Sequence, residues 1–124
     1  MDYSFTAGKE RTKVNLQATA MGDGLVVRIF NENAHIGAVS IGEYDFSNHR
    51  ASVSVMTRLG HKDDVVAQKA AHSISKLTRK TVCVVTGIHL DNITTDEMAQ
   101  ILKYSDLLVI ELVNHIKVDR MGIS

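Results

Sequence analysis

The chain has 124 residues, enough for one hydrophobic core and too few for two, so we expect a single domain over residues 1–124. Lysine plus arginine equals aspartate plus glutamate, at 14 each, and no long run of one sign occurs, which argues against a nucleic-acid-binding protein. Neither a signal peptide nor a stretch of about 18 apolar residues is present, so we expect a cytoplasmic protein without a membrane span. The single cysteine, Cys83, is expected in the core.

The first half of the chain has the two-residue period of β-strands. We expect residues 1–11 to be a flexible segment that precedes the fold. Beyond it, apolar or alternating segments are separated by turns rich in Gly, Asn and Asp, and the turn MGDG predicts a hairpin. The simplest arrangement is four strands in antiparallel succession. The predicted strands are 12–20, 25–30, 36–44 and 51–57.

After residue 64 the apolar period becomes helical. An amphipathic helix is predicted from Val65, with Val66, Ala67, Ala70, Ala71, Ile74 and Leu77 on its core face. The segment TVCVVTGI at 81–88 is apolar on both faces and predicts an interior strand. The capping-box sequence TTDE at 94–97 predicts the start of a second helix. The core stripe of that helix is Met98, Ile101, Leu102, Leu108, Val109, Leu112, Val113 and Ile116.

These elements have the order ββββαβα. They predict a two-layer α/β sandwich, of the α+β kind, in which one mixed five-stranded sheet carries both helices on one face. Leu107 and Ile110 lie off the apolar stripe of the second helix. We therefore expect part of the outer surface to be apolar and to form a homo-oligomer contact.

The strand directions bring three of the six histidines to one edge of the sheet. The two strands that flank the first helix are expected to run parallel, so both end at the same edge, where His61 and His89 follow them. The preceding strand runs antiparallel and begins at this edge, next to His35. Because open α/β sheets bind ligands beyond the carboxyl ends of their parallel strands, this edge is the candidate site.

Glycine and charged residues accompany the histidines. Gly60 would let backbone amides approach a phosphate, with Arg58 or Lys62 as the counter-charge. Asp63 and Asp64 would repel an anion unless they cap the helix or hold a bridging metal ion, and a purely capping role is the alternative to a functional one. The candidate cofactor-binding residues are His35, Arg58, Gly60, His61, Lys62, Asp63, Asp64, His89 and Asp91.

The same histidines admit a second interpretation. His35, His61 and His89 could bind a metal ion, although none has the His-x-x-x-His spacing of helical metal sites. No serine has a Gly-x-Ser-x-Gly context, and the residues indicate a pocket more than a reaction. The alternatives to a cofactor-binding protein are a small metal-dependent enzyme that uses these histidines, with Asp63 or Asp64 as general base, and a structural subunit that docks through the second helix.

Three segments in order resemble a known family. HIGAVSIG (35–42), SVSVMTRLGHKDDVVA (52–67) and VVTGIHLDNIT (84–94) resemble the prenylated flavin (prFMN) chaperone family, whose members are also described as LpdD-like accessory proteins of gallate decarboxylase. The resemblance covers roughly residues 24–116. It implies a non-catalytic accessory protein that binds reduced prenylated FMN, made by a flavin prenyltransferase, and supports its delivery to or maturation in a UbiD-type decarboxylase.

The resemblance also bears on the site. Within the matching segments stand His35, Gly60, His61, Asp63, Asp64 and His89. The expected ligand is prenylated FMN or FMN, with a divalent metal ion as a further candidate. Because the chain has only three Phe and three Tyr, the apolar walls of a flavin site would come from aliphatic side chains or from a second subunit of a homo-oligomer.

Overall fold

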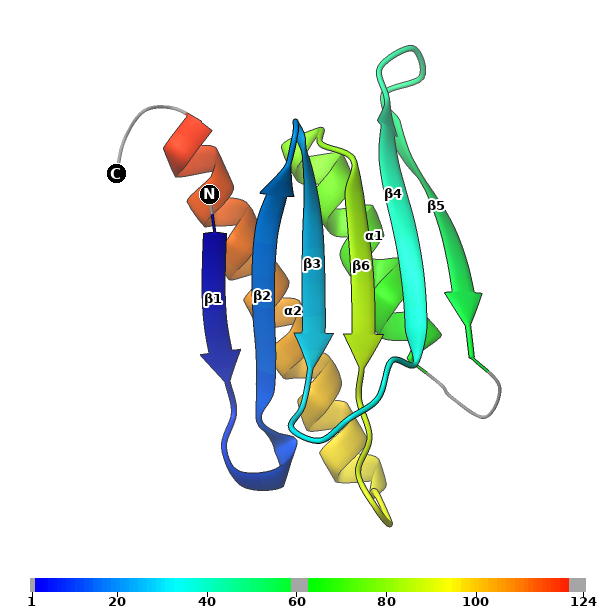
Figure 1. Cartoon of the computed structure of the whole chain (residues 1–124), viewed down its shortest axis with the longest axis vertical. Helices are drawn as coiled ribbons and strands as arrows, with labels where there is room; N and C mark the ends of the chain where they lie inside the picture. The colour runs from blue at the N-terminus through cyan, green and yellow to red at the C-terminus, as the bar shows by residue number, and fades with distance from the viewer. Residues whose placement is uncertain (1, 59–62, 121–124) are drawn as a thin grey trace.

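The structure is a computed structural model that describes residues 2–58 and 63–120. Within them, six strands and two α-helices form two layers, and Figure 1 shows both helices behind the same face of one sheet. This confirms the predicted two-layer sandwich. The elements are β1 (Asp2–Ala7), the 3₁₀ turn η1 (Glu10–Thr12), β2 (Val14–Met21), β3 (Gly24–Phe30), β4 (Ala38–Asp45), β5 (Arg50–Thr57), α1 (Asp64–Thr78), β6 (Val82–Gly87) and α2 (Thr95–Arg120).

The sheet has six strands in the described residues, so the predicted number of five is wrong. Their order is β1-β2-β3-β6-β4-β5. The chain does not continue directly from β3 to a neighbouring β4, as antiparallel succession would require, because β6 lies between them. β6 pairs parallel with β3 and antiparallel with β4. It is therefore an interior strand, as its apolar sequence predicts.

The strand missed by the sequence analysis is β1, in a segment expected to be flexible. β1 pairs antiparallel with β2, and its residues Tyr3, Phe5 and Ala7 are partly buried while their neighbours are exposed. The Tyr3 hydroxyl donates to Oδ2 of Asp119 at 2.5 Å, and burial together with this bond raises the pKa of Tyr3 to about 12. The alternation is short, and the partner that covers it is the distant end of α2.

The core lies between the sheet and the helices. The helix-facing residues of β2, β3 and β6 are fully or almost fully buried, and so are six of the eight predicted stripe residues of α2. On α1 the predicted core face is confirmed except at Leu77, which is 46% exposed. Leu77 belongs to the last turn of α1 and lines a groove between the two helices, so it packs sideways toward α2 rather than down onto the sheet.

The predicted start of α2 is confirmed in atomic detail. The Thr94 amide donates to Glu97 Oε1, and the Glu97 amide donates to Thr94 Oγ1, each at 3.0 Å. The Arg11 guanidinium also donates to Glu97, and this contact does most to hold the pKa of the Glu97 carboxyl below its usual range. The capping box thus also anchors the loop between β1 and β2.

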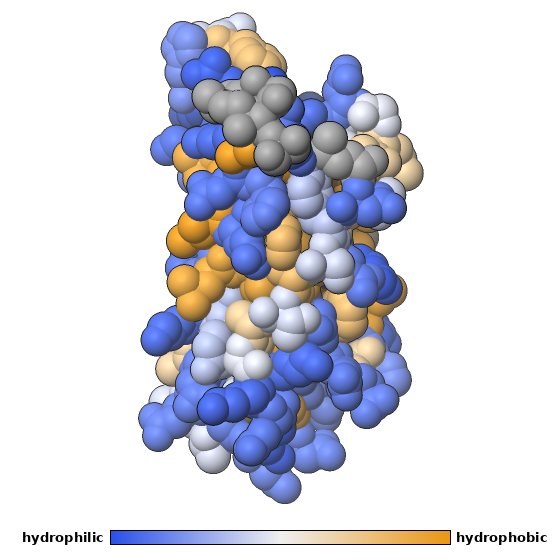
Figure 2. Space-filling model, turned by 90° about the vertical axis from the view of Figure 1, so that its left-hand side faces the viewer, coloured by the Kyte–Doolittle hydropathy of each residue, from blue (hydrophilic) through white to orange (hydrophobic). Residues whose placement is uncertain are grey.

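The outer surface carries apolar residues, as predicted for α2. Leu107 is 49% exposed and Ile110 is 54% exposed. Figure 2, seen from the side of β1 and α2, shows hydrophobic residues breaking the polar surface at mid-height. Cys83, expected in the core, is instead partly exposed, because its side chain alternates with the helix-facing Val82 and Val84. No helix in the described part of the chain is long and apolar enough to span a membrane.

Candidate functional site

One edge of the sheet gathers the ends of its central strands. β3 and β6 run parallel, and β5 runs parallel to β6 with the antiparallel β4 between them. Consequently β3, β5 and β6 end at the lower edge in Figure 1, and β4 begins there. This is the arrangement inferred from the sequence. Of the predicted residues, His35 and His89 lie in the two loops at this edge, whereas Gly60, His61 and Lys62 lie outside the described residues.

Asn31 joins the two loops, because its side chain makes two hydrogen bonds to the backbone of His89. Its Nδ2 donates to the carbonyl of His89 at 2.7 Å, and its Oδ1 accepts the His89 amide at 3.0 Å. Asn31 is only 4% exposed, so these bonds are shielded from water. The loop that carries His35 is thereby held against the loop that carries His89.

Asp63 ties the start of α1 to the end of β6. It occupies the N-cap position and is 6% exposed, and its Oδ2 accepts the Ile88 amide at 2.9 Å. Gly37 makes room for this carboxylate, because a Cβ at Gly37 would overlap Asp63 Oδ2. The structure therefore places Asp63 in a positioning role within the edge. Asp64 follows it as an acidic residue in the first turn of α1, where the helix dipole favours a negative charge.

Arg58 and Asp91 lie at the same edge, and each has hydrogen-bond partners there, while both stay predicted cofactor-binding residues. The Arg58 guanidinium donates to the carbonyl of Ile36 at 2.8 Å, and the backbone amide of Arg58 donates to the carbonyl of Gly37. The Asp91 side chain is 90% exposed and lies 3.0 Å from His89 Nε2, while its carbonyl accepts from Arg11. Both residues brace the edge loops from the outside.

A small hollow opens at this edge on the sheet face away from the helices. Its volume is about 150 Å³, and its lining includes Arg28, Phe30, His35, Val85 and Gly87. The Arg28 guanidinium lies 5.0 Å from the centroid of the Phe30 ring. Gly87 lets the His35 loop pass close to β6, because a Cβ at Gly87 would lie 2.7 Å from the His35 carbonyl oxygen. A cation, an aromatic ring and an imidazole thus face one small space.

Sequence reasoning missed Arg28 and Phe30. Both belong to the segment LVVRIF, in which Leu25, Val27 and Ile29 are buried and the alternate residues face away from the helices. That alternation, at the end of a strand leading into the His35 loop, was the available signal. The signal is weak, because every residue of the segment except Arg28 is apolar and the two faces of the strand look alike.

The hollow fits part of a flavin rather than a whole one. Pockets for ligands of this size usually measure about 300–1,000 Å³, so about 150 Å³ leaves room for one end of the molecule. Arg28 is suited to a phosphate, and the Phe30 ring is suited to the edge of an aromatic system. As for metal binding, the described residues contain no group of three His, Cys, Asp or Glu side chains that could hold an ion. The three-histidine site includes His61 and stays a prediction.

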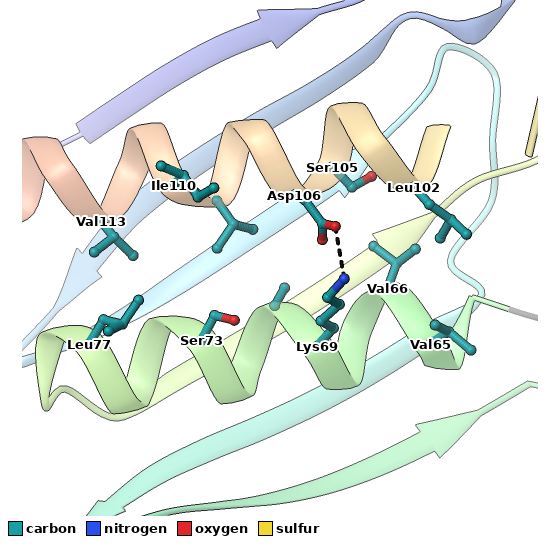
Figure 3. Close-up of a pocket in the computed structure, with 12 residues that line it drawn as sticks. Val65, Val66, Lys69, Ser73, Leu77, Leu102, Ser105, Asp106, Ile110 and Val113 are labelled. Atoms are coloured by element: carbon teal, nitrogen blue, oxygen red, sulfur yellow. Dashed lines mark hydrogen bonds and ion pairs between the residues drawn. The ribbon is translucent and has the colours of Figure 1, made fainter. Parts of the chain in front are cut away.

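A second cavity lies elsewhere, between α1 and α2. It measures about 290 Å³, and Figure 3 shows aliphatic side chains from both helices facing it, with the ion pair of Lys69 and Asp106 crossing it at 2.8 Å. None of the predicted site residues in the described ranges 2–58 and 63–120 lines it. The groove is more apolar than the edge hollow and lacks an aromatic side chain or a histidine.

Comparisons with known proteins agree with the fold and the resemblance. A family model described as the prenylated flavin chaperone LpdD-like domain matches residues 8–117. No curated protein matches the chain. Among solved structures, the chain is similar to one described as a novel chaperone complex for yeast 20S proteasome assembly, with a TM-score of 0.62 and 13% identity over 93% of this chain and 97% of that one. At this identity the likeness shows a shared fold alone.

Proposed function

The chain belongs to the prenylated flavin chaperone LpdD-like family, and from that premise we propose that it binds reduced prenylated FMN at the edge where β3 and β6 end. In this role it receives the cofactor made by a flavin prenyltransferase and supports its delivery to, or maturation in, a UbiD-type decarboxylase. The observation that carries the proposal is the hollow in which Arg28, Phe30 and His35 converge.

Each of these side chains has a part in the proposed binding. The Arg28 guanidinium supplies a fixed positive charge for the cofactor's phosphate, and its contact with the Phe30 ring restricts its position. His35 can donate or accept one hydrogen bond at the rim. The prenylated flavin supplies the chemistry that the decarboxylase needs, and this chain contributes only binding and protection from water.

The segment from Arg58 to Asp64 completes the proposal. Asp63 positions the start of α1 against β6, and Arg58 fixes the other end of the segment against Ile36. Gly60, His61 and Lys62 stand between these two anchors in the sequence and remain proposed cofactor-binding residues.

Anaerobic gel filtration with FMN and with reduced prenylated FMN tests the proposal. We expect the wild type to retain the prenylated cofactor at micromolar protein. Arg28→Gln and His35→Asn should each weaken binding about 10-fold or more, in line with the loss of a charge-assisted hydrogen bond to the phosphate at Arg28 and of a hydrogen bond at the rim at His35.

The matched control is His49→Asn. His49 is also an exposed loop histidine, but it lies at the opposite edge, and asparagine tolerates its positive φ of 54°. Its binding should equal that of the wild type. Failure of the wild type to retain either flavin, or equal losses in His35→Asn and His49→Asn, would overturn the proposal.

A further inference from the structure

The sheet has one face covered by helices and one face covered by nothing in the described part of the chain, as Figure 1 shows. We call the second the open face. Its centre carries apolar side chains from four neighbouring strands, β3, β6, β4 and β5. This apolar block consists of Val26, Phe30, Val39, Ile41, Met56, Cys83 and Val85.

The strand register makes the block continuous. In one cross-strand row Val26 lies opposite Cys83, which lies opposite Ile41. In the next row Arg28 lies opposite Val85, which lies opposite Val39, which lies opposite Met56, so three of its four members are apolar. The two rows are adjacent, because Cys83 and Val85 lie two residues apart on the same face of β6, as do Val39 and Ile41 on β4, so they form a single patch. Phe30 lies at its edge, opposite Gly87.

The block is exposed to a degree that is unusual for a monomer. Ile41 is 49% exposed and Met56 is 78% exposed, while the other members are partly exposed. β6 is thus apolar on both faces but covered on only one, although strands with this composition are normally buried on both. Contiguous apolar patches of this kind mark interaction surfaces.

The surroundings of the block favour a second copy of the same chain as the partner. Uncharged polar residues border the block on both sides, namely Asn15, Gln17 and Thr19 on β2 and Ser52 and Ser54 on β5. The face carries three acidic and two basic residues, so a symmetric pair of faces can set charges of opposite sign against each other. These charged residues are Asp2, Arg28, Glu43, Asp45 and Arg50.

The size of the face also suits a dimer. Its six strands have six to eight residues each. At strand spacings of about 4.8 Å and about 3.3 Å per residue, the face covers about 650 Å² before side-chain relief is added. A stable dimer buries about 800 Å² per partner. Two such sheets can stack about 10 Å apart, as in sandwich folds.

We propose that the protein is a homodimer in which the open faces of two copies pack together, with the apolar block at the centre of the interface. Phe30 and Val85 belong both to the block and to the lining of the hollow beside His35. The second copy therefore supplies the missing wall of the hollow, a part of the inference that rests on the proposed function. The dimer itself requires no cofactor.

Analytical ultracentrifugation of the protein without flavin provides the test. It compares two lysine variants of equally exposed aliphatic residues, one on the open face and one on α2. Ile41 on the open face and Leu107 on α2 are both 49% exposed. In Ile41→Lys the dimer dissociation constant should rise about 100-fold or more, because a symmetric interface buries the added charge twice. Leu107→Lys should leave it unchanged. Met56→Lys, at a more exposed position, repeats the test with less risk to folding.

Two results would overturn the inference. One is a wild type that sediments as a monomer at high micromolar concentration. The other is dissociation of Leu107→Lys with Ile41→Lys still dimeric, which would place the interface on the helices.

The alkylation rate of the native thiol tests whether this surface is buried in the dimer. Cys83 is the only cysteine and lies in the apolar block. Its alkylation by N-ethylmaleimide should be about 10-fold slower in the dimeric wild type than in Met56→Lys, because buried thiols are inert. Equal rates in the two proteins would contradict the proposed position of the interface.

Discussion

The two loops that flank β4 are built in opposite ways. The loop after β4 closes on itself, because the Asp45 carboxylate accepts the Ser47 amide at 2.9 Å and the Asn48 side chain at 2.7 Å. The loop before β4, residues 31–37, is held by segments far away in the chain. Gly37 donates to Thr86 and accepts from Arg58, and Asn31 clasps His89.

This difference shows that the shape of the candidate site is determined by contacts between distant segments of the chain. A turn that satisfies its own polar groups can be exchanged without disturbing its neighbours. The 31–37 loop instead contacts β6 through hydrogen bonds, the start of α1 through the close approach of Gly37 to Asp63, and the 88–91 loop through Asn31. A change in any of these should move the hollow, and substitutions in the two loops should therefore differ in their effects.

The largest effect is expected at Gly37. Gly37→Ala places a Cβ against the buried Asp63 carboxylate and should lower the free energy of unfolding by about 2–3 kcal/mol, as overpacking does. Chemical denaturation measures it. The control is Gly22→Ala, where a Cβ meets nothing within 4 Å and the cost is the positive φ, about 1 kcal/mol. Equal losses in both would show that the edge is not tightly packed.

A smaller effect is expected at Asn31. Asn31→Ala removes both hydrogen bonds to the His89 backbone and should lower the free energy of unfolding by about 1–2 kcal/mol. It should also speed amide hydrogen exchange in residues 88–91. Asn48→Ala, in the self-contained turn, should change stability by less than about 0.5 kcal/mol. If residues 88–91 stay protected in Asn31→Ala, the clasp does not hold the two loops together.

The smallest effect concerns pH and the turn after β4. The hydrogen bond from the Asn48 side chain does most to hold the pKa of Asp45 below its ordinary value of 3.8. A carboxyl with a lowered pKa adds stability above its unfolded pKa and loses it as pH falls through the folded value. The wild type should therefore be slightly more stable than Asp45→Asn at about pH 6, and the difference should vanish in acid. If the difference in thermal midpoint between the wild type and Asp45→Asn stays constant as the pH is lowered, the Asp45 charge makes no such contribution.

Local patterns were sufficient to predict much of the fold. The alternation in β2, the amphipathic stripe of α2 and the Thr94–Glu97 capping box depend on neighbouring residues, and the structure agrees with each. The direction of β5 relative to β6 followed from the connection through α1. Together they placed His35 and His89 at one edge.

The rest depends on contacts between distant segments. The apolar side of β1 is completed only by the end of α2, and the position of β6 between β3 and β4 is a matter of strand pairing that no local pattern specifies. Asp63 was interpreted as a helix cap or a ligand. Its partner, the Ile88 amide, lies 25 residues away, so the sequence could not reveal that contact.

The most direct test of the central claim is an anaerobic ¹H–¹⁵N NMR titration of the protein with reduced prenylated FMN. We predict that the largest amide shift changes occur in residues 28–37 and 85–91, around Arg28 and His35, with residues 46–49 unaffected. Shift changes confined to the groove between α1 and α2, or spread equally over both loops that flank β4, would contradict the account.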